Sequence, residues 1–380
     1  MPIISAEFAA ETDALLSWLR DAALPFWAEM AIDSKGGFFE DLALDGTPNT
    51  DAVRRVRVQA RQIFVYANAH KAGWYDSTAI LDRLYDFLMT YGYRPDGAAG
   101  FVHRIGPDYT VTDAKRDLYD HAFYLLACAS LMGCDGATKH DEAAALTDTL
   151  LDFIDVEMGA CTGWTEGVPA VLPRRQNPHM HLFETSMALY DVTGESRFMD
   201  RAARIYRLFT DHFFDADNHI IREFFDNDWT YADGALGQTA EPGHACEWVW
   251  LLGQYEARSG VDTRCYADAL YARAFENGGV FLNDEEDVND AVRRDTKRLW
   301  VQTEVIRAHL AQMEYGNKDA QDKAVAAMAA FRESYLNPNG TWNDQFDGAG
   351  GMIATTIPTS TFYHIYGMIT EAVRIKSLGP

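Results

Sequence analysis

The chain has 380 residues, of which 48% are hydrophobic and 13% aromatic, so it is long enough to bury a large core. Its formal net charge of -24 repels phosphate backbones and anionic lipids, which argues against nucleic acid and membranes as partners. No apolar run reaches the length of a membrane span, and charges interrupt the first 24 residues, unlike a secretory signal. The five cysteines are scattered without metal-ligand spacing, which indicates reduced thiols in a cytoplasmic protein.

Apolar residues recur at helical spacing in about twelve segments that come in pairs. The predicted helices span 9–31, 51–73, 77–92, 114–133, 140–158, 178–195, 197–213, 240–258, 263–277, 295–315, 319–336 and 359–376. Within a pair the connection is long and rich in glycine and aromatic residues, as at 36–46, which predicts a short β-hairpin.

This alternation repeats about every sixty residues, which is typical of a repeat architecture. On length alone, two ordinary domains and one large toroid are both open. Six two-helix units that close a ring are the simplest arrangement. The sequence therefore predicts an all-α fold, an (α/α)6 barrel, with one catalytic domain over residues 1–380 and short β-hairpins in the long loops.

In such a ring the second helix of each pair lines a central cavity. Each of these helices carries a polar residue near its start or middle, and we expect the six to converge on the axis. They are Arg61, Tyr119, His181, His244, Glu304 and His364.

Two histidines in this set could work as an acid and base pair. His244 lies in EPGHACEWVWLL, one helical turn before Glu247, and that carboxylate could fix the imidazole tautomer. His364 takes the corresponding place in TSTFYHIYG. Isomerising an aldose requires a base for the C2 proton and a group that moves protons on O1 and O2, and neutral imidazole suits both near neutral pH.

A third cluster lies in RRQNPHMHLFET. Asn177, His181 and Glu184 share one helix face, whereas His179 points elsewhere. Because residues two apart do not face each other, the two histidines are poor joint metal ligands. We therefore expect no metal and no cofactor.

Arg61 is the arginine most deeply placed in the apolar pattern of its helix, so its guanidinium could neutralise a developing enediolate oxygen. We expect Arg54, Arg55 and Arg57 to lie on a solvated face.

Aromatic residues accompany these polar groups. RLWVQTE places Trp300 one turn before Glu304, an aromatic platform beside a carboxylate, as sugar sites use. Tyr119 and His121 of DLYDHAF are expected to complete the ring of side chains.

In these segments the chain resembles the N-acylglucosamine 2-epimerase superfamily, within it the aldose–ketose isomerase branch that includes D-mannose isomerases. The resemblance spans nearly the whole chain. It implies a metal-free cis-enediol mechanism with His244 and His364 as the acid and base pair, and it favours His364 as the carrier of the C1/C2 proton. It also implies a monosaccharide-binding monomer or homodimer, with sugar contacts from Arg61, Tyr119, Asn177, His181, Glu184, Glu247, Trp300 and Glu304.

Several alternatives stay open. The superfamily also contains N-acylglucosamine and cellobiose 2-epimerases and sulfoquinovose isomerases, although a sulfonate needs extra ligands that the sequence does not reveal. An inverting glycoside hydrolase could use Glu247 and Glu304 as its two carboxylates, but it has no obvious need for three inner histidines. A binding protein without activity is the third alternative, since an animal member of the family is described as a renin-binding protein.

Overall fold

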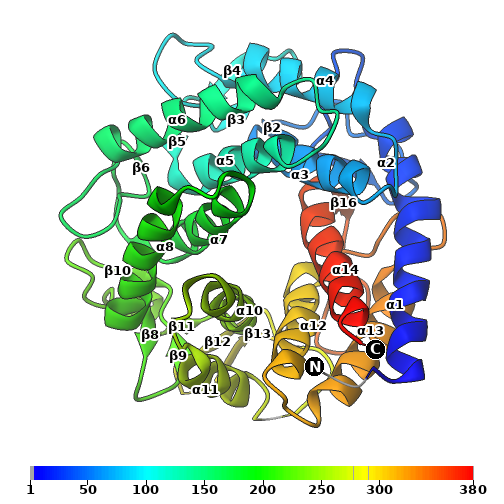
Figure 1. Cartoon of the computed structure of the whole chain (residues 1–380), viewed down its shortest axis with the longest axis vertical. Coiled ribbons are helices and arrows are strands. Elements are labelled where there is room, and N and C mark those ends of the chain that lie inside the picture. Colours follow the sequence, from blue (N-terminus) through cyan, green and yellow to red (C-terminus); the bar gives the residue numbers. More distant parts are fainter. Residues whose placement is uncertain (1–3, 277, 290, 380) are drawn as a thin grey trace.

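The helices of the computed structural model form two concentric rings (Figure 1), and the structure describes residues 4–276, 278–289 and 291–379. Among these residues the inner ring has six helices: α3 (Arg57–Lys71), α5 (Leu118–Met132), α7 (Asn177–Thr193), α10 (Pro242–Ser259), α12 (Leu299–Glu314) and α14 (Phe362–Ser377). The outer ring contains α1 (Ala6–Trp18), η1 (Leu19–Ala23), α2 (Leu24–Met30), α4 (Thr78–Phe87), η2 (Leu88–Gly92), α6 (His140–Glu157), α8 (Ser196–Leu208), η3 (Phe209–Phe213), α11 (Arg264–Ala274) and α13 (Ala320–Tyr335). The predicted (α/α)6 barrel is confirmed.

The two rings differ in how their helices are buried. Outer helix α8 buries one stripe, formed by Phe198, Ala202, Ile205 and Leu208 at helical spacing, and its other residues are partly or fully exposed. Inner helix α5 is buried from residue 118 to 131 with the exception of Tyr119. A polar residue on an inner helix therefore either bonds within the wall or faces the ring's centre. Among the described residues, no helix is long and apolar enough to cross a membrane.

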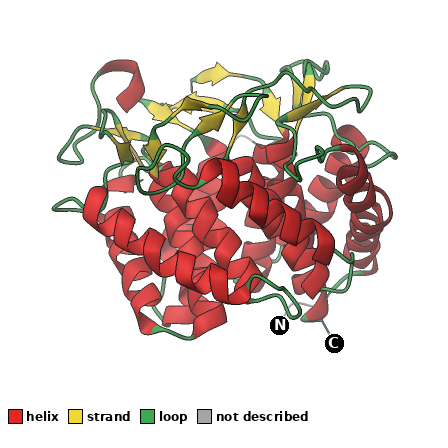
Figure 2. Ribbon diagram, turned by 90° about the horizontal axis from the view of Figure 1, so that it is seen from above, coloured by secondary structure: helices red, strands yellow, loops and turns green. Residues whose placement is uncertain are grey.

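Short strands gather on one face of the ring (Figure 2). The strand that leads into each inner helix pairs antiparallel with a strand in the long loop of an adjacent repeat, and before α14 a 3-10 helix, η4 (Thr359–Thr361), lies between the strand and the helix. The pairs are β2 (Arg54–Arg55) with β3 (Arg104–Ile105), β5 (Arg116–Asp117) with β6 (Gly167–Val168), β7 (Arg174–Arg175) with β10 (Phe224–Phe225), β11 (Thr239–Ala240) with β12 (Glu285–Asp287), β14 (Lys297–Arg298) with β15 (Gln345–Phe346) and β16 (Thr356–Pro358) with β1 (Asp41–Ala43).

The pair of β16 with β1 joins the last repeat to the first and closes the circle. Four further strands of the described chain lie within single loops. β4 (Val111–Asp113) extends β3, β13 (Val292–Arg294) extends β12, and β8 (Phe214–Asp215) pairs with β9 (Ile220–Ile221). A four-residue helix, α9 (Gly234–Gly237), lies in the loop that leads to α10.

These strands explain where the predicted helix boundaries are wrong. The helices expected to begin at 51, 114 and 295 begin at Arg57, Leu118 and Leu299. The residues just before each start pair as strands, so the interstrand hydrogen bonds override the helical pattern of the sequence. The helix expected over 263–277 ends at Ala274, and residue 277 lies outside the described residues.

The seam between the first and last repeats is packed by two tryptophans. The Trp27 and Trp342 rings are stacked with centroids 4.4 Å apart, and Trp27 Nε1 donates to the Gly340 carbonyl oxygen at 3.0 Å. Gly340 has a φ of 88°, and a Cβ there would come within 2.6 Å of the Ala22 backbone oxygen. Only glycine therefore lets this loop approach the first helix so closely.

We expect Trp342→Ala to lower the free energy of unfolding by about 3–5 kcal/mol, because it opens a cavity at this seam. Urea titration followed by circular dichroism would measure the loss. Val156→Ala is the control, since that side chain is 76% exposed and its loss should change little. A Trp342→Ala protein as stable as the wild type would contradict the role assigned to the seam.

Candidate active site

The strand-bearing face of the ring opens into a cavity of about 380 Å³. Of the ten residues predicted for the site, eight line this cavity: Arg61, Tyr119, Asn177, His181, His244, Glu247, Trp300 and His364. The other two, Glu184 and Glu304, lie behind its wall, where each binds a histidine. The cavity is also lined by seven residues that were not predicted: Arg55, Glu241, Arg298, Asp344, Pro358, Ser360 and Thr361.

The first turns of the inner helices carry the chemical groups. His244 and His364 are each the third residue of their helices, α10 and α14, and Asn177 is the first of α7. Because the preceding strand fixes where each helix starts, residues far apart in sequence come to one height around the cavity. The predicted convergence of the inner-helix side chains is thus explained by the strand pairs.

His244 is bound on both ring nitrogens. Its Nδ1 lies 3.0 Å from Glu223 Oε1, and the Asn177 amide nitrogen Nδ2 lies 3.1 Å from Nε2. A protonated Nε2 donates, so the Asn177 amide then turns its Oδ1, which has no partner among the described residues, toward this ring nitrogen. Burial lowers the pKa of this imidazole, but the negative charges of Glu223 and Glu241 outweigh it and raise the pKa to about 9. His244 is therefore an imidazolium at neutral pH and can give up a proton.

The carboxylate expected to orient His244 was Glu247, and this expectation is wrong. Glu223, in the loop that precedes α10, takes that role instead. The Glu247 Oε1 atom lies 3.8 Å from His181 Nδ1, and burial together with the charges of Glu304 and Glu184 raises the pKa of Glu247 well above its usual value. An acid beside two phenylalanines, in IIREFFDNDW, was the available signal for Glu223.

His364 has the opposite electrostatic surroundings. Its Nδ1 lies 2.9 Å from Glu304 Oε1, and Glu304 Oε2 accepts a hydrogen bond of 2.8 Å from Arg307. Burial, then the positive charges of Arg61, His181 and Arg307, lower the pKa of His364 well below its usual value. Within the described residues Nε2 has no hydrogen-bond partner, so a neutral imidazole presents that lone pair to the cavity.

Burial raises the pKa of Glu304, and Arg307 opposes that shift by stabilising the carboxylate. Arg307 was not predicted from the sequence. Its guanidinium is buried against the Trp250 ring, 3.5 Å from the ring centroid. It compensates the charge of a carboxylate that would otherwise be costly to bury.

Trp300 lies between the two histidines. Its ring centroid is 5.2 Å from that of His244 and 5.7 Å from that of His364. The indole therefore forms an apolar wall against which a sugar ring can pack while both imidazoles reach it.

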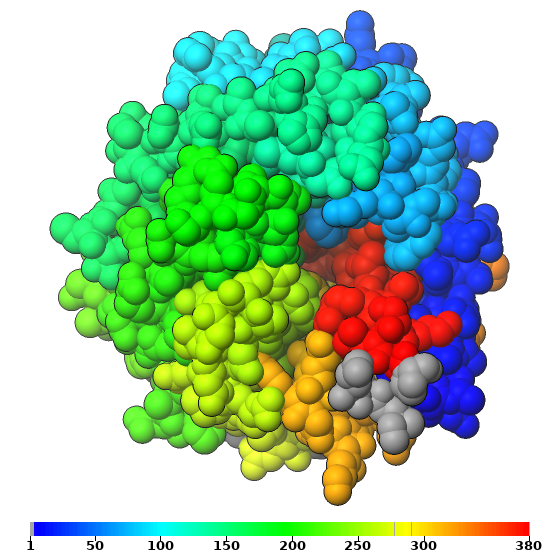
Figure 3. All heavy atoms as spheres, in the orientation of Figure 1, coloured from blue at the N-terminus to red at the C-terminus, as the bar shows by residue number. Residues whose placement is uncertain are grey.

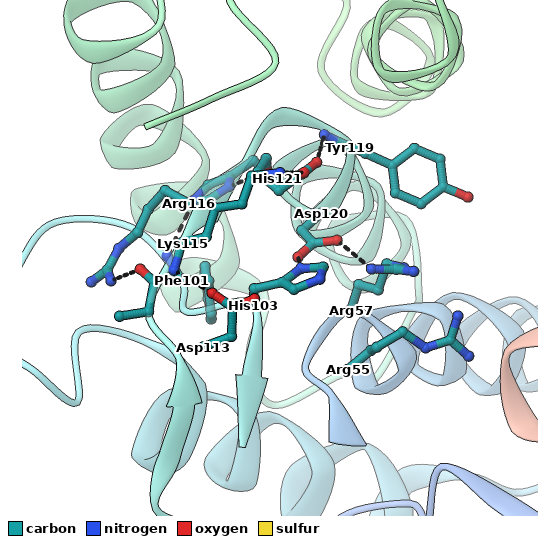
Figure 4. Close-up of polar contacts among 12 residues, drawn as sticks. Arg55, Arg57, Phe101, His103, Asp113, Lys115, Arg116, Tyr119, Asp120 and His121 are labelled. Atoms are coloured by element: carbon teal, nitrogen blue, oxygen red, sulfur yellow. Dashed lines mark hydrogen bonds and ion pairs between the residues drawn. The ribbon is translucent and has the colours of Figure 1, made fainter. Parts of the chain in front are cut away.

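A cation and a phenol form the opposite wall. Arg61 donates to the Tyr119 hydroxyl oxygen at 2.6 Å and to the Ser360 carbonyl at 3.1 Å. Arg57 lies over the Tyr119 ring, 5.1 Å from its centroid, and binds the buried carboxylate of Asp120 at 2.8 Å. The same carboxylate binds Nδ1 of His103 at 2.6 Å (Figure 4).

The expected solvated face of Arg54, Arg55 and Arg57 is therefore wrong. Arg54 is buried in an ion pair with Asp33, Arg55 pairs with Glu40 at the cavity, and Arg57 pairs with Asp120. Carboxylates from neighbouring segments bind these cations, and the sequence pattern of the helix alone does not show such partners.

His121 is not part of the cavity, in contrast to the expectation. Its Nδ1 lies 2.7 Å from the Asp117 carbonyl oxygen and its Nε2 accepts from the Phe101 backbone N–H at 3.1 Å, so it anchors the neighbouring loop (Figure 4). His179 points away from the cavity as predicted. Its ring nitrogens lie against the carbonyl oxygens of Arg175 and Trp164.

A layer of buried groups closes the floor of the cavity. His181 Nδ1 lies 3.2 Å from Glu184 Oε2, and the Tyr363 hydroxyl donates to the same carboxylate at 2.6 Å. Below this layer a second cavity of about 250 Å³ opens on the opposite face, which Figure 3 shows hollowed near its centre. The floor therefore separates the histidine pair from the other end of the ring.

Two groups of described residues offer metal-ligand atoms within 4.8 Å of one another: His181 with Glu184 and Glu247, and Glu223 with Glu241 and His244. In each group the histidine Nδ1 is already bound to a carboxylate.

We expect Glu223→Gln to lower the pKa of His244 from about 9, because glutamine keeps the shape of the side chain but removes its charge. NMR titration of the histidine ring protons would measure the shift. Since this pKa lies above the usual 6.5, the stabilisation from the pair is present below pH 6.5 and lost as the pH rises through about 9. The control is Glu157→Gln on outer helix α6, and an unshifted His244 in Glu223→Gln would contradict the assignment.

Comparisons with known proteins show the family to which the chain belongs. A mannose-6-phosphate isomerase of Rhizobium meliloti (strain 1021) is 35% identical over 94% of this chain and 95% of its own. A D-mannose isomerase of Thermobifida fusca is 32% identical over 69% of each chain. The crystal structure of a D-mannose isomerase superposes with a TM-score of 0.83 over 98% of this chain and 99% of that one, at 20% identity, which shows the shared fold. The family model for N-acylglucosamine 2-epimerase (GlcNAc 2-epimerase) matches residues 37–368, and the chain belongs to that family.

Proposed function

We propose that the protein isomerises an unphosphorylated aldose to its ketose, D-mannose to D-fructose and secondarily D-lyxose to D-xylulose. Membership of the family makes it a sugar isomerase or epimerase. The acid and base roles rest on the opposite displacement of two histidine pKa values at one cavity: His244 upward to about 9 and His364 well downward. When the pKa values of two neighbouring groups are shifted in opposite directions, one group can act as the acid and the other as the base. The observation that supports an isomerase over a 2-epimerase is the higher identity of the relatives named isomerases.

The two roles follow from these protonation states. The His244 imidazolium donates a proton to the ring oxygen while the pyranose opens, and the neutral imidazole then takes up the proton that the anomeric O1 hydroxyl loses. Neutral His364 then removes the C2 proton through Nε2 and returns it to C1, passing through a cis-enediol. A proton moves from O2 to O1 in the same step, so the sugar gains and loses none overall.

The remaining cavity residues serve the oxygens and orient the bases. Arg61 and the Tyr119 hydroxyl stabilise negative charge that develops on O1 and O2. Glu304 accepts from Nδ1 of His364 and Glu223 from Nδ1 of His244, so each carboxylate fixes the face its imidazole turns to the sugar. Asn177, His181, Glu247 and Trp300 bind the sugar directly. Glu184 acts through His181.

The alternatives gain less support. For an inverting hydrolase, Glu247 and Glu304 would have to face the sugar together, but Glu304 is fully buried behind His364. A 2-epimerase uses the same histidines and differs only in returning the proton to C2. Relatives named cellobiose 2-epimerase reach 25% identity, below the relatives named isomerases at 28%, 32% and 35%.

The reaction can be assayed by NMR in deuterated water with D-mannose, D-lyxose, cellobiose, N-acetyl-D-mannosamine and D-mannose 6-phosphate. We expect D-mannose to give D-fructose, and His364→Asn to lower kcat by about 10²–10⁴-fold, because the base for C2 is lost. The control is His140→Asn, at an exposed position of α6. Conversion of cellobiose or the amino sugar alone would make the protein an epimerase, and an unaffected His364→Asn would refute the assigned base.

We also expect the activity to survive exhaustive treatment with EDTA, because the proposed proton transfers use only side chains. Activity on D-mannose before and after dialysis against the chelator, with the removed metal measured by mass spectrometry, gives the answer. Loss of activity that Mn²⁺ or Zn²⁺ restores would place a metal at one of the two histidine–carboxylate groups and overturn the metal-free mechanism.

A further inference from the structure

The rim of the cavity carries three charged groups that the proposed chemistry does not use. Glu241 and Arg298 directly precede α10 and α12, and Asp344 lies in the loop before α14. All three line the cavity on the strand side, whereas both histidines lie in the first turns of their helices. A sugar whose C1 and C2 lie between the histidines must place the rest of its ring against other parts of the lining.

These rim groups have unused hydrogen-bonding capacity. Asp344 is bound by the Thr361 hydroxyl at 2.8 Å, and the Glu241 carboxylate accepts no hydrogen bond from the described residues. The Nε and Nη2 atoms of Arg298 are buried but make no hydrogen bond there, although Asp284 and Glu241 oxygens lie 3.2 and 3.6 Å away. Burial raises the pKa of both Asp344 and Glu241, as expected for carboxylates short of donors.

The rim offers both hydrogen-bond donors and acceptors, as the hydroxyl groups of a sugar require. Each hydroxyl donates one hydrogen bond and accepts others. A guanidinium among carboxylates offers both kinds of partner, so the rim can satisfy hydroxyls without help from water.

The charge at the rim excludes a second kind of ligand. Arg55 is paired with Glu40, and Arg298 lies within 4 Å of Asp284 and Glu241. Glu241 also lies 3.9 Å from His244, whereas Asp344 has no ion-pair partner among the described residues. A phosphate or sulfonate placed beside Asp344 would meet an uncompensated negative charge, and like charges repel strongly in a buried site.

We propose that Glu241, Arg298 and Asp344 form a subsite for the hydroxyls remote from C1 and C2, and that Asp344 restricts the substrate to sugars without an anionic substituent there. This deepens the proposed function and rests on it for the direction in which the sugar lies. On this proposal the protein differs in the substrate it accepts from a relative named mannose-6-phosphate isomerase, although the two sequences are 35% identical.

The test compares 1,5-anhydro-D-mannitol, a closed-ring analogue that cannot isomerise, with its 6-phosphate. Ligand-observed NMR titration gives both dissociation constants without requiring turnover. We expect the wild type to bind the neutral analogue more tightly. The measured quantity is the dissociation constant of the 6-phosphate divided by that of the neutral analogue. Asp344→Asn should lower this ratio by about tenfold at low salt, because it removes a charge without changing the size of the side chain. High salt should lower the same ratio in the wild type, because it screens the repulsion.

Asp295→Asn is the matched control, since it removes the same charge from an exposed residue that does not line the cavity. Glu241→Gln is a second rim variant for use if Asp344→Asn does not fold. A wild type that binds the 6-phosphate as tightly as the neutral analogue would overturn the proposal, as would folded rim variants that leave the ratio unchanged. If the wild type isomerises neither mannose nor its 6-phosphate, the proposed function fails, while the two constants still decide whether the rim selects by charge.

Discussion

Six short antiparallel strand pairs determine where the inner helices begin, and the site depends on that constraint. A strand of two or three residues before each inner helix is hydrogen-bonded to the loop of an adjacent repeat, and the circle closes where β16 meets β1. This sets the axial height of the first helical turn in every repeat. The histidines of α10 and α14 and the indole of α12 therefore reach the same cavity, although 120 residues separate His244 from His364 in the sequence.

The cavity shows how one side chain type acquires two roles. Each imidazole that we propose as catalytic has a carboxylate at Nδ1 and is almost fully buried, so local geometry alone does not separate His244 from His364. The difference comes from the next groups outward. Glu241 adds negative charge near His244, whereas Arg61, His181 and Arg307 add positive charge near His364. The groups near His364 come from other inner helices, Arg61 from α3, His181 from α7 and Arg307 from α12.

Helical periodicity and motifs predicted the ring and most of the lining, because inner-helix residues such as Arg61, His244 and His364 lie at regular positions in apolar patterns. The errors have physical causes. Residues 51–56 continue the helical pattern, but Arg54 and Arg55 are held in a strand, so the helix starts later. Glu223 and Asp344 come from loops, where no periodicity indicates which way a side chain points. Glu223 binds His244 and Asp344 accepts from Thr361, and only the folded chain brings these side chains together.

The central claim is that the two histidines differ in protonation at neutral pH. Neutron diffraction from a deuterium-exchanged crystal at pH 7 would locate the ring hydrogens directly. The account predicts deuterium on both nitrogens of His244, and on Nδ1 alone of His364, directed at Glu304. Deuterium on Nε2 of His364, or a singly protonated His244, would contradict the assignment of acid and base.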